Sequence, residues 1–327
     1  MSGFKTILYR TSLCLALMGG MAGAQAAQDY PRHAVRFLVP YGAGTSTDTL
    51  ARILGEAISK ETGQSIVVED RPGAEGAIGV QAVAKAPADG YTVLITTSST
   101  QVLNVHLYKK LPYDPVKDFI PVRTLGQSPM GMSVNADSPF HSVSDFLKAA
   151  HAEPGKLTFG SATSVTRLAG EMLQQLAGIK LLNVPYKSNA ASANALIAKE
   201  VDTIFSDPSL TIPYTKEPGA RLRILGVSAN RRTAALPDVP TMIEAGVPDY
   251  TMSFWYGAWV PAGTPPAVVE QINGLLDRAM KSPSAQAFLK NGGAENFGLS
   301  GKEFADFQAS EIEKYGVLIK AAGIEPQ

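Results

Sequence analysis

The fold is decided between residues 35 and 60, which read VRFLVPYGAGTSTDTLARILGEAISK. Residues 35–40 form a short apolar run closed by Pro40, and they predict a β-strand because proline cannot continue the interior of a sheet. Between residues 49 and 60 the apolar side chains recur every three or four positions, which predicts an amphipathic helix. The stretch therefore predicts a strand, a turn rich in glycine and hydroxyl groups, and a helix, as in an α/β fold.

The same alternation continues along the chain. Residues 65–69 predict a strand, 78–86 a helix and 91–96 a strand, and this βαβαβ order predicts a parallel sheet with helices on both faces. A second set follows, with predicted strands at 157–160, 182–184, 202–205 and 224–227 and predicted helices at 167–176 and 191–199. We therefore expect two α/β lobes.

Two apolar stretches have the composition of segments that cross between the lobes. The first lies within residues 111–139, which are punctuated by prolines, and the second lies within residues 252–261. Two crossings predict that one domain is inserted into the other. We expect domain 1 to comprise residues 27–125 and 256–327, domain 2 to comprise residues 126–255, and a ligand cleft to lie between them.

The first 26 residues have the pattern of a secretory signal peptide. Lys5 and Arg10 precede an apolar run, and small residues then offer cleavage sites that end at Ala24 or Ala26. We expect cleavage after Ala26 and a periplasmic location, with an N-terminal membrane anchor as the alternative. Cleavage would remove Cys14, the one cysteine of the chain, and a cysteine-free protein suits an oxidising compartment.

Composition excludes several classes of protein. Of the 327 residues, 45% are hydrophobic and 18% are charged, which excludes a disordered chain. The 29 Lys and Arg residues balance the 29 Asp and Glu residues, so we expect no broad basic surface and no nucleic-acid partner. One cysteine excludes a disulfide framework and thiolate metal sites, and the four histidines lack metal-ligand spacing. We therefore expect neither a metal nor a cofactor.

The turn at residues 40–48 is the first candidate binding site. It opens a predicted helix, whose first N–H groups have no acceptor within the helix and attract anions. Glycines allow close approach to the backbone, and hydroxyl groups can donate hydrogen bonds. The alternative is ordinary helix capping. The turn lacks the Gly-Lys-Ser/Thr ending of a P-loop and the third glycine of a dinucleotide site. Its candidate residues are Tyr41, Gly42, Ala43, Gly44, Thr45, Ser46 and Asp48.

Three further turns follow predicted strands. In open α/β sheets, ligands bind beyond the carboxyl ends of the strands, and all four turns are expected at that edge. The turn at 160–167 adds an arginine that can grip a carboxylate bidentately, although a surface helix charge is the alternative. The candidates from these turns are Ser98 and Thr100; Ser161, Ala162, Thr163, Ser164, Thr166 and Arg167; and Asp207.

Catalytic motifs are missing from the sequence. It contains no G-x-S-x-G elbow and no H-E-x-x-H motif. His106 lies near the third turn and is the histidine closest to a candidate site, with a partly buried helix histidine as the alternative. Trp255 could line a cleft or lie in the core. We therefore predict no catalytic residues.

Several motifs resemble the Bug family, the extracytoplasmic solute receptors of tripartite tricarboxylate transporters. They are spread in order over the chain: VRFLVPYGAG at 35–44, VEDRPGAEG at 68–76, ADGYT at 88–92, LPYDP at 111–115, NVPYK at 183–187, LPDVPT at 236–241, WYG at 255–257 and PAGTP at 261–265. The resemblance implies a type II periplasmic-binding-protein fold. It also implies capture of small carboxylates, among them amino acids, citrate-like acids and aromatic acids, and their delivery to a membrane permease.

The resemblance also implies that the loops at 40–48 and 160–167 face each other as a pincer around the ligand. Tyr186 belongs to one of the matching motifs and is a further candidate. Because Arg167 adds a charge where the family carries other residues, we hypothesise that it holds a second acidic group or a strongly bound carboxylate. We expect a monomeric receptor; a sensor module for a membrane kinase and a periplasmic hydrolase remain alternatives.

Overall fold

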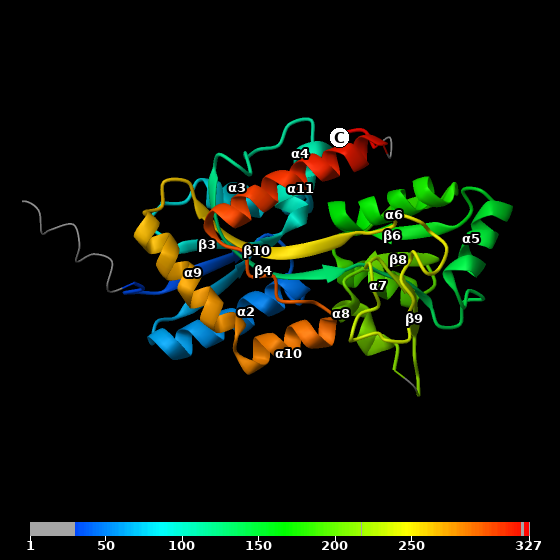
Figure 1. Cartoon of the computed structure of the whole chain (residues 1–327), viewed down its shortest axis with the longest axis horizontal. Coiled ribbons are helices and arrows are strands. Elements are labelled where there is room, and N and C mark those ends of the chain that lie inside the picture. The colour runs from blue at the N-terminus through cyan, green and yellow to red at the C-terminus, as the bar shows by residue number, and fades with distance from the viewer. Residues whose placement is uncertain (1–29, 217, 322–323, 327) are drawn as a thin grey trace, which may run out of the picture.

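A computed structural model describes residues 30–216, 218–321 and 324–326 (Figure 1). The predicted signal peptide, residues 1–26, lies outside the described residues. The chain forms two α/β lobes placed side by side, and each lobe is built on a five-stranded sheet. The expected α/β class and two-lobed architecture are confirmed.

The first sheet has the strand order β2-β1-β3-β10-β4. The bounds of its strands in chain order are Val35–Val39 (β1), Ile66–Asp70 (β2), Thr92–Thr97 (β3), Phe119–Pro129 (β4) and Ser253–Pro261 (β10). Strand β1 pairs in parallel with β2 and β3, as the βαβαβ pattern predicts. Strand β10, which the βαβαβ pattern did not include, is antiparallel to both β3 and β4, so the sheet is mixed.

The second sheet has the order β7-β6-β8-β5-β9. The bounds of its strands are Gly131–Asn135 (β5), Thr158–Ser161 (β6), Leu182–Pro185 (β7), Thr203–Ser206 (β8) and Leu222–Val227 (β9). Strand β6 is parallel to β7 and β8, whereas β5 is antiparallel to β8 and β9. In each lobe the reversed strand is one by which the chain passes between the lobes, and its direction is set by that crossing rather than by a strand–helix–strand unit.

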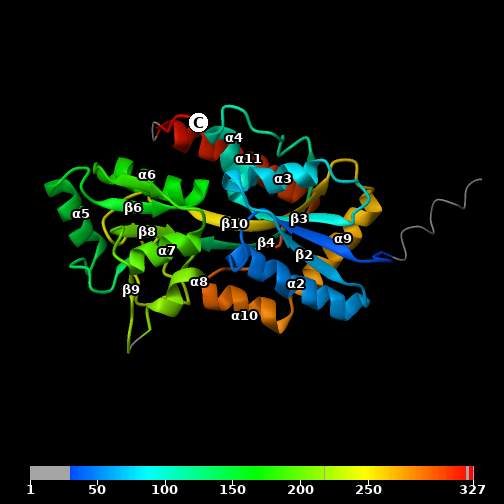
Figure 2. The ribbon, with the colours of Figure 1, turned by 180° about the vertical axis from the view of Figure 1, so that it is seen from behind.

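Helices cover both faces of each sheet (Figures 1 and 2). In the first lobe, α2, α9 and α10 lie on one side and α3, α4 and α11 on the other, while in the second lobe α6 lies opposite α7 and α8. The first-lobe helices are Ser46–Thr62 (α2), Ala74–Gly76 (η1), Ala77–Ala84 (α3), Ser99–Leu103 (η2), Asn104–Leu107 (α4), Pro266–Met280 (α9), Pro283–Gly292 (α10) and Gly301–Ala321 (α11). The second-lobe helices are Val143–Ala152 (α5), Ser164–Ala177 (α6), Asn189–Ile197 (α7), Pro208–Thr211 (α8) and Ile212–Tyr214 (η3).

Helices α2, α6 and α7 begin two or three residues earlier than hydrophobic spacing predicts. Each is preceded by a hydroxyl residue whose side chain accepts a hydrogen bond from an amide three residues later: Thr45, Thr163 and Ser188. Such N-caps allow polar first turns to be helical even though they bury no apolar stripe. The caps thereby bring these first turns to the carboxyl ends of the preceding strands.

The chain passes from the first sheet to the second at Met130, between β4 and β5, and returns by β10. The domain boundaries predicted at 125/126 and 255/256 fall inside β4 and β10, and they stay a prediction. In β10, Trp255 and Trp259 are fully buried and donate hydrogen bonds to Glu311 and Gln308 of α11. Of the two interpretations of Trp255, the structure supports the core.

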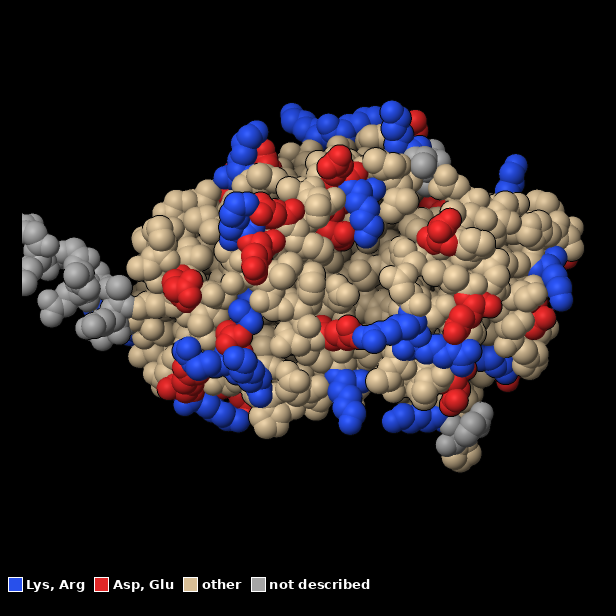
Figure 3. Space-filling model, in the orientation of Figure 1, with Lys and Arg blue, Asp and Glu red and all other residues tan. Residues whose placement is uncertain are grey.

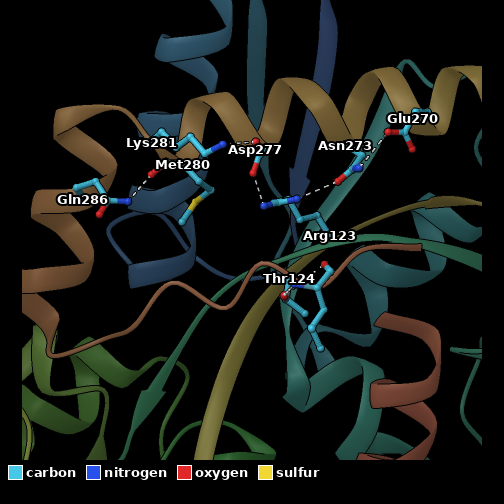
Figure 4. A network of polar contacts seen from close by, with 9 residues as sticks. Arg123, Thr124, Glu270, Asn273, Asp277, Met280, Lys281 and Gln286 are labelled. Atoms are coloured by element: carbon cyan, nitrogen blue, oxygen red, sulfur yellow. Dashed lines mark hydrogen bonds and ion pairs between the residues drawn. The ribbon is translucent and has the colours of Figure 1, made fainter. Parts of the chain in front are cut away.

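Arg123 of β4 attaches α9 to the first sheet (Figure 4). Its guanidinium forms an ion pair with Asp277 and donates a hydrogen bond to Asn273 at 3.2 Å, and only 11% of its side chain is exposed. The next residue, Thr124, exchanges hydrogen bonds with Leu299 in the segment before α11. The C-terminal segment is thus tied back to the first lobe.

Candidate functional site

A cavity of about 500 Å³ lies between the lobes and is lined from both. Ten of the residues predicted from the sequence line it: Tyr41, Gly42, Thr45, Ser46, Ser161, Ala162, Thr163, Thr166, Tyr186 and Asp207. The loops at 40–48 and 160–167 therefore face one shared space. This arrangement follows from their common position after parallel strands.

The first turn of α2 supplies two amides to this space. Thr45 Oγ1 accepts from the amide of Asp48 at 3.3 Å, and the carbonyl of Thr45 accepts from the amide of Thr49 at 2.9 Å. The amides of Ser46 and Thr47 donate no hydrogen bond to any acceptor within the described part of the chain. These N–H groups lie at the positive end of the helix dipole and suit an anion.

The first turn of α6 has the same arrangement on the opposite lobe. Thr163 and Thr166 form a capping box, and Thr166 Oγ1 also accepts from the amide of Ala162 at 2.9 Å. Among the described residues, no acceptor is bonded to the amides of Ser164 and Val165. Two helix N-termini with unbonded amides therefore converge on the cavity from opposing lobes.

Helix α7 contributes a third N-terminus, whose residues were not among the predicted site residues. Ser188 caps it by accepting from the amide of Ala191 at 3.1 Å, and Lys187, Ser188 and Asn189 line the cavity. The Ser-Asn pair before a helical pattern was the available signal, because these residues favour N-caps. Lys187 adds a positive charge beside the third set of amides.

Asp207 and Tyr256 form a buried pair in the cavity wall. Tyr256 Oη donates to Asp207 Oδ2 at 2.5 Å, and the amide of Ser209 donates to Asp207 Oδ1 at 2.9 Å. Burial raises the pKa of the Asp207 carboxyl. Burial, reinforced by the neighbouring carboxylate, raises the pKa of Tyr256 well above its usual value. The pair presents a hydrogen-bonded polar wall to the ligand space.

The turn after β3 contributes different residues from those predicted. Thr97 and Ser99 line the cavity, and Tyr41 Oη is hydrogen-bonded to Thr97 Oγ1 at 2.8 Å. Burial raises the pKa of Tyr41. Ser98 and Thr100 are buried and do not line the cavity, and Thr100 Oγ1 is hydrogen-bonded to Thr96 Oγ1 at 2.8 Å. The turn coils into η2 and so presents only some of its hydroxyl groups.

Five other predicted residues also lie outside the cavity lining: Ala43, Gly44, Asp48, Ser164 and Arg167. The first two are exposed, and Asp48 braces the loop by accepting from the amide of Gly44 at 2.8 Å and pairing with Arg52. Arg167 lies in α6, where its charge acts on Glu171 one turn later. The cavity lining includes Thr163, Val165 and Thr166 at the start of α6 but not Arg167, the fourth residue of the helix.

Phe254 and Tyr256 line the cavity, whereas Trp255 lies in the core. Successive side chains of a strand point to opposite faces, which explains the division. The segment 72–76 also lines the cavity, and Glu75 brings a carboxylate. In the sequence this segment contributes to the family resemblance alone, since its turn-forming residues carry no separate signal for a site.

None of the four histidines, all of which the structure describes, lines the cavity. His106 is half-buried, and its Nε2 lies 2.7 Å from the carbonyl oxygen of Ile312. Within residues 30–216, 218–321 and 324–326, no group of three or more His, Cys, Asp or Glu side chains could hold a metal ion. Every helix in these ranges is too short or too polar to cross a lipid bilayer. Basic and acidic side chains lie interspersed over the face drawn in Figure 3.

Comparisons with known proteins identify the family of the chain. The family model of the tripartite tricarboxylate transporter family receptor matches residues 50–324. A relative in Pseudomonas sp. (strain P51), the UPF0065 protein in the tcbD-tcbE intergenic region, is 36% identical over 94% of this chain and 91% of that protein.

Two solved structures share the fold over most of the chain. The structure of R. palustris Rpa4515 with adipate has a TM-score of 0.87 and 33% identity, and the match covers 91% of this chain and 100% of that chain. The structure of the periplasmic binding protein BugD has a TM-score of 0.85 and 30% identity, with the same coverage. The protein therefore belongs to the tripartite tricarboxylate transporter receptor family, the TctC or Bug type of periplasmic binding protein.

Proposed function

We propose that the protein is a periplasmic receptor that captures a small organic carboxylate between its lobes and delivers it to a permease of the tripartite tricarboxylate type. The observation that carries the proposal is the convergence of the α2 and α6 N-termini, with unbonded first-turn amides, on one cavity between the lobes. The ligand class comprises di- and tricarboxylates, amino acids and aromatic acids. The ligand leaves chemically unchanged.

Neutral amides are suited to reversible capture of an anion. They supply hydrogen bonds and part of a helix dipole without a bare counter-ion that would have to be desolvated. The hydroxyls of Thr45, Ser46 and Thr163 line the cavity and can complete the hydrogen bonds of the carboxylate. Met130, Val165 and Phe254 offer an apolar surface to the carbon skeleton of the ligand.

Contacts between the lobes support closure around the ligand. Ser46 Oγ of α2 lies 3.1 Å from Ser209 Oγ of α8, and Ser164 Oγ of α6 lies 2.6 Å from Glu75 Oε2. A ligand that touches both lobes binds the closed form better than the open form and shifts the population toward it. The crossing strands β4 and β10 are the proposed hinge.

Native mass spectrometry of the freshly purified protein, followed by calorimetry with succinate, adipate, citrate, L-glutamate and benzoate, tests the proposal. We expect at least one acid to bind with a Kd near 1 μM, or about −8 kcal/mol, since a receptor must also release its cargo. NMR of the recovered ligand is expected to show the original compound. A folded protein that binds none of these acids, or that converts one of them, contradicts the proposal.

Export and partner are part of the same proposal. We expect the protein isolated from the periplasm to begin at Ala27 and to be monomeric, as mass spectrometry and light scattering can measure. Pull-down of the cognate membrane permease from detergent extract, with and without the acid, separates a transport receptor from a sensor of a membrane kinase. Recovery of the kinase instead of the permease supports the second role at the same site.

A further inference from the structure

Glu75 places a negative charge in a cavity whose other acidic lining residue, Asp207, is buried and hydrogen-bonded to Tyr256. It is half-buried and lines the cavity in the segment before α3. Among the residues that the structure describes, no ion pair includes Glu75. A carboxylate of the ligand brought next to it is repelled, whereas a positive group is attracted.

The backbone at Glu75 is strained. Ala74 and Glu75 have φ values of 46° and 50°, in the left-handed region that disfavours residues with a Cβ atom. The strain is held by Tyr108 Oη, which donates to the carbonyl of Ala74 at 3.0 Å, and by Asn104 Nδ2, which donates to that of Glu75 at 3.4 Å. Strain that its surroundings maintain in this way is typical of functional positions.

The carboxylate of Glu75 is also held in place from the other lobe. The hydroxyl oxygen of Ser164, the first residue of α6, lies 2.6 Å from Glu75 Oε2 and also 2.6 Å from Asn104 Oδ1, so these two acceptors share its one proton. The carboxylate therefore sits beside the helix N-terminus that is proposed to bind the ligand. Across the cavity, the second lobe contributes Lys187, which is likewise absent from the ion pairs of the described chain.

The cavity thus offers one unpaired anion from the first lobe and one unpaired cation from the second. We propose that Glu75 is a specificity-determining residue, which selects a ligand that carries an ammonium or similar positive group in addition to its carboxylate. A second carboxylate at this position is disfavoured. The inference rests on the proposed function, because it requires that the cavity binds carboxylates.

Paired ligands test this selectivity by calorimetry at pH 7.5. 4-Aminobutyrate replaces one carboxylate of glutarate by an ammonium group, and L-glutamate adds an ammonium group to glutarate. We expect the natural protein to bind at least one of the two ammonium acids tenfold or more tightly than glutarate. Glu75→Gln is expected to lower that ratio at least tenfold, since the amide keeps the size and the acceptor for Ser164 but loses the charge.

Glu270→Gln is the matched control, because Glu270 is exposed on α9 outside the cavity. Its ratio of affinities for the ammonium acid and for glutarate is expected to equal that of the natural protein. Circular dichroism and thermal unfolding confirm that both variants fold. Preference of the natural protein for glutarate, or an unchanged ratio in Glu75→Gln, overturns the inference while leaving carboxylate binding intact. Equal weakening of all ligands also overturns it, since Glu75 would then only join the lobes. If the natural protein binds none of these ligands but binds another of the five acids of the proposed function, only this inference is overturned. If it binds none of the acids in either set, the proposed function and this inference are overturned together.

Discussion

The proposed role of the Ser46 backbone amide in ligand binding can be tested without disturbing helix α2. Ser46 is the first residue of α2, and Thr45 before it has φ −71° and ψ 159°, which suits a residue preceding proline. Proline is tolerated at the first helical position but has no N–H group. Ser46→Pro therefore removes the proposed ligand contact and retains the helix, whereas Ser46→Ala removes only the hydroxyl.

We expect Ser46→Pro to weaken binding of the tightest acid at least tenfold, or about 1.4 kcal/mol, because a hydrogen bond to a charged group is lost. Ser46→Ala is expected to change the Kd less than Ser46→Pro. Calorimetry measures both, and circular dichroism checks the helix content. Equal losses in the two variants would show that the hydroxyl, not the amide, binds the ligand.

The buried carboxyl of Asp207 should make the stability of the folded protein depend on pH. Burial raises the pKa of its carboxyl in the folded protein, so that between its unfolded and folded pKa values the folded state holds more protons. Stability must then fall as pH rises through that window, which begins near the ordinary value of 3.8. Asp207→Asn has no titratable carboxyl group at this position, so its stability lacks this contribution to the pH dependence.

Urea unfolding at a series of pH values measures the difference in unfolding free energy between the natural protein and Asp207→Asn. We expect the natural protein to lose unfolding free energy relative to Asp207→Asn as pH rises above about 4. The difference is expected to level off once the carboxyl of the folded protein is ionised. A difference that stays constant with pH, or that moves in favour of the natural protein, contradicts a raised pKa at Asp207.

At the scale of elements, the attachment of α9 to β4 depends on Arg123. Its guanidinium is largely buried and is shared by Asp277 and Asn273 (Figure 4). Arg123→Met keeps apolar volume but leaves the Asp277 carboxylate without this partner. We expect the free energy of unfolding to fall by about 2 kcal/mol, the range for hydrogen bonds to charged groups.

Lys60→Met is the control for this element. Lys60 pairs with Glu56 on the exposed face of α2, with side-chain exposures of 74% and 66%, and such pairs contribute little to stability. Urea unfolding of both variants is expected to show a loss for Arg123→Met alone. Similar midpoints for the two would mean that α9 is held by apolar packing and not by the guanidinium.

At the scale of the whole molecule, the two lobes meet around the cavity and are joined by the crossing strands. Hydrogen bonds such as Ser46–Ser209 join the lobes here, as the proposed closure requires. We expect X-ray scattering to give a larger radius of gyration without ligand than with a saturating acid, since ligand shifts the population toward closure. At the same acid concentration, the radius of gyration of the Ser46→Pro variant is expected to decrease less. Identical scattering curves for the natural protein with and without acid would contradict closure.

The sequence was sufficient for features that depend on neighbours along the chain. The strand at 35–39, the helix that follows it and the hydroxyl-rich loops between them could be recognised because periodicity and capping act over a few residues. The position of those loops at one edge followed from strand direction. Nine of the predicted site residues line the cavity for that reason, and a tenth, Tyr186, was predicted from the family resemblance.

Tertiary structure alone decided which distant segments meet. Strand β10 inserts between β3 and β4 in antiparallel orientation, and no local pattern at residues 253–261 specifies its neighbours. Glu75 meets Ser164 across 89 residues, and Arg167 lies away from the cavity although the charge itself was visible in the sequence. The local chain sets how a segment folds, whereas the packing of the two lobes sets which of its side chains reach the ligand.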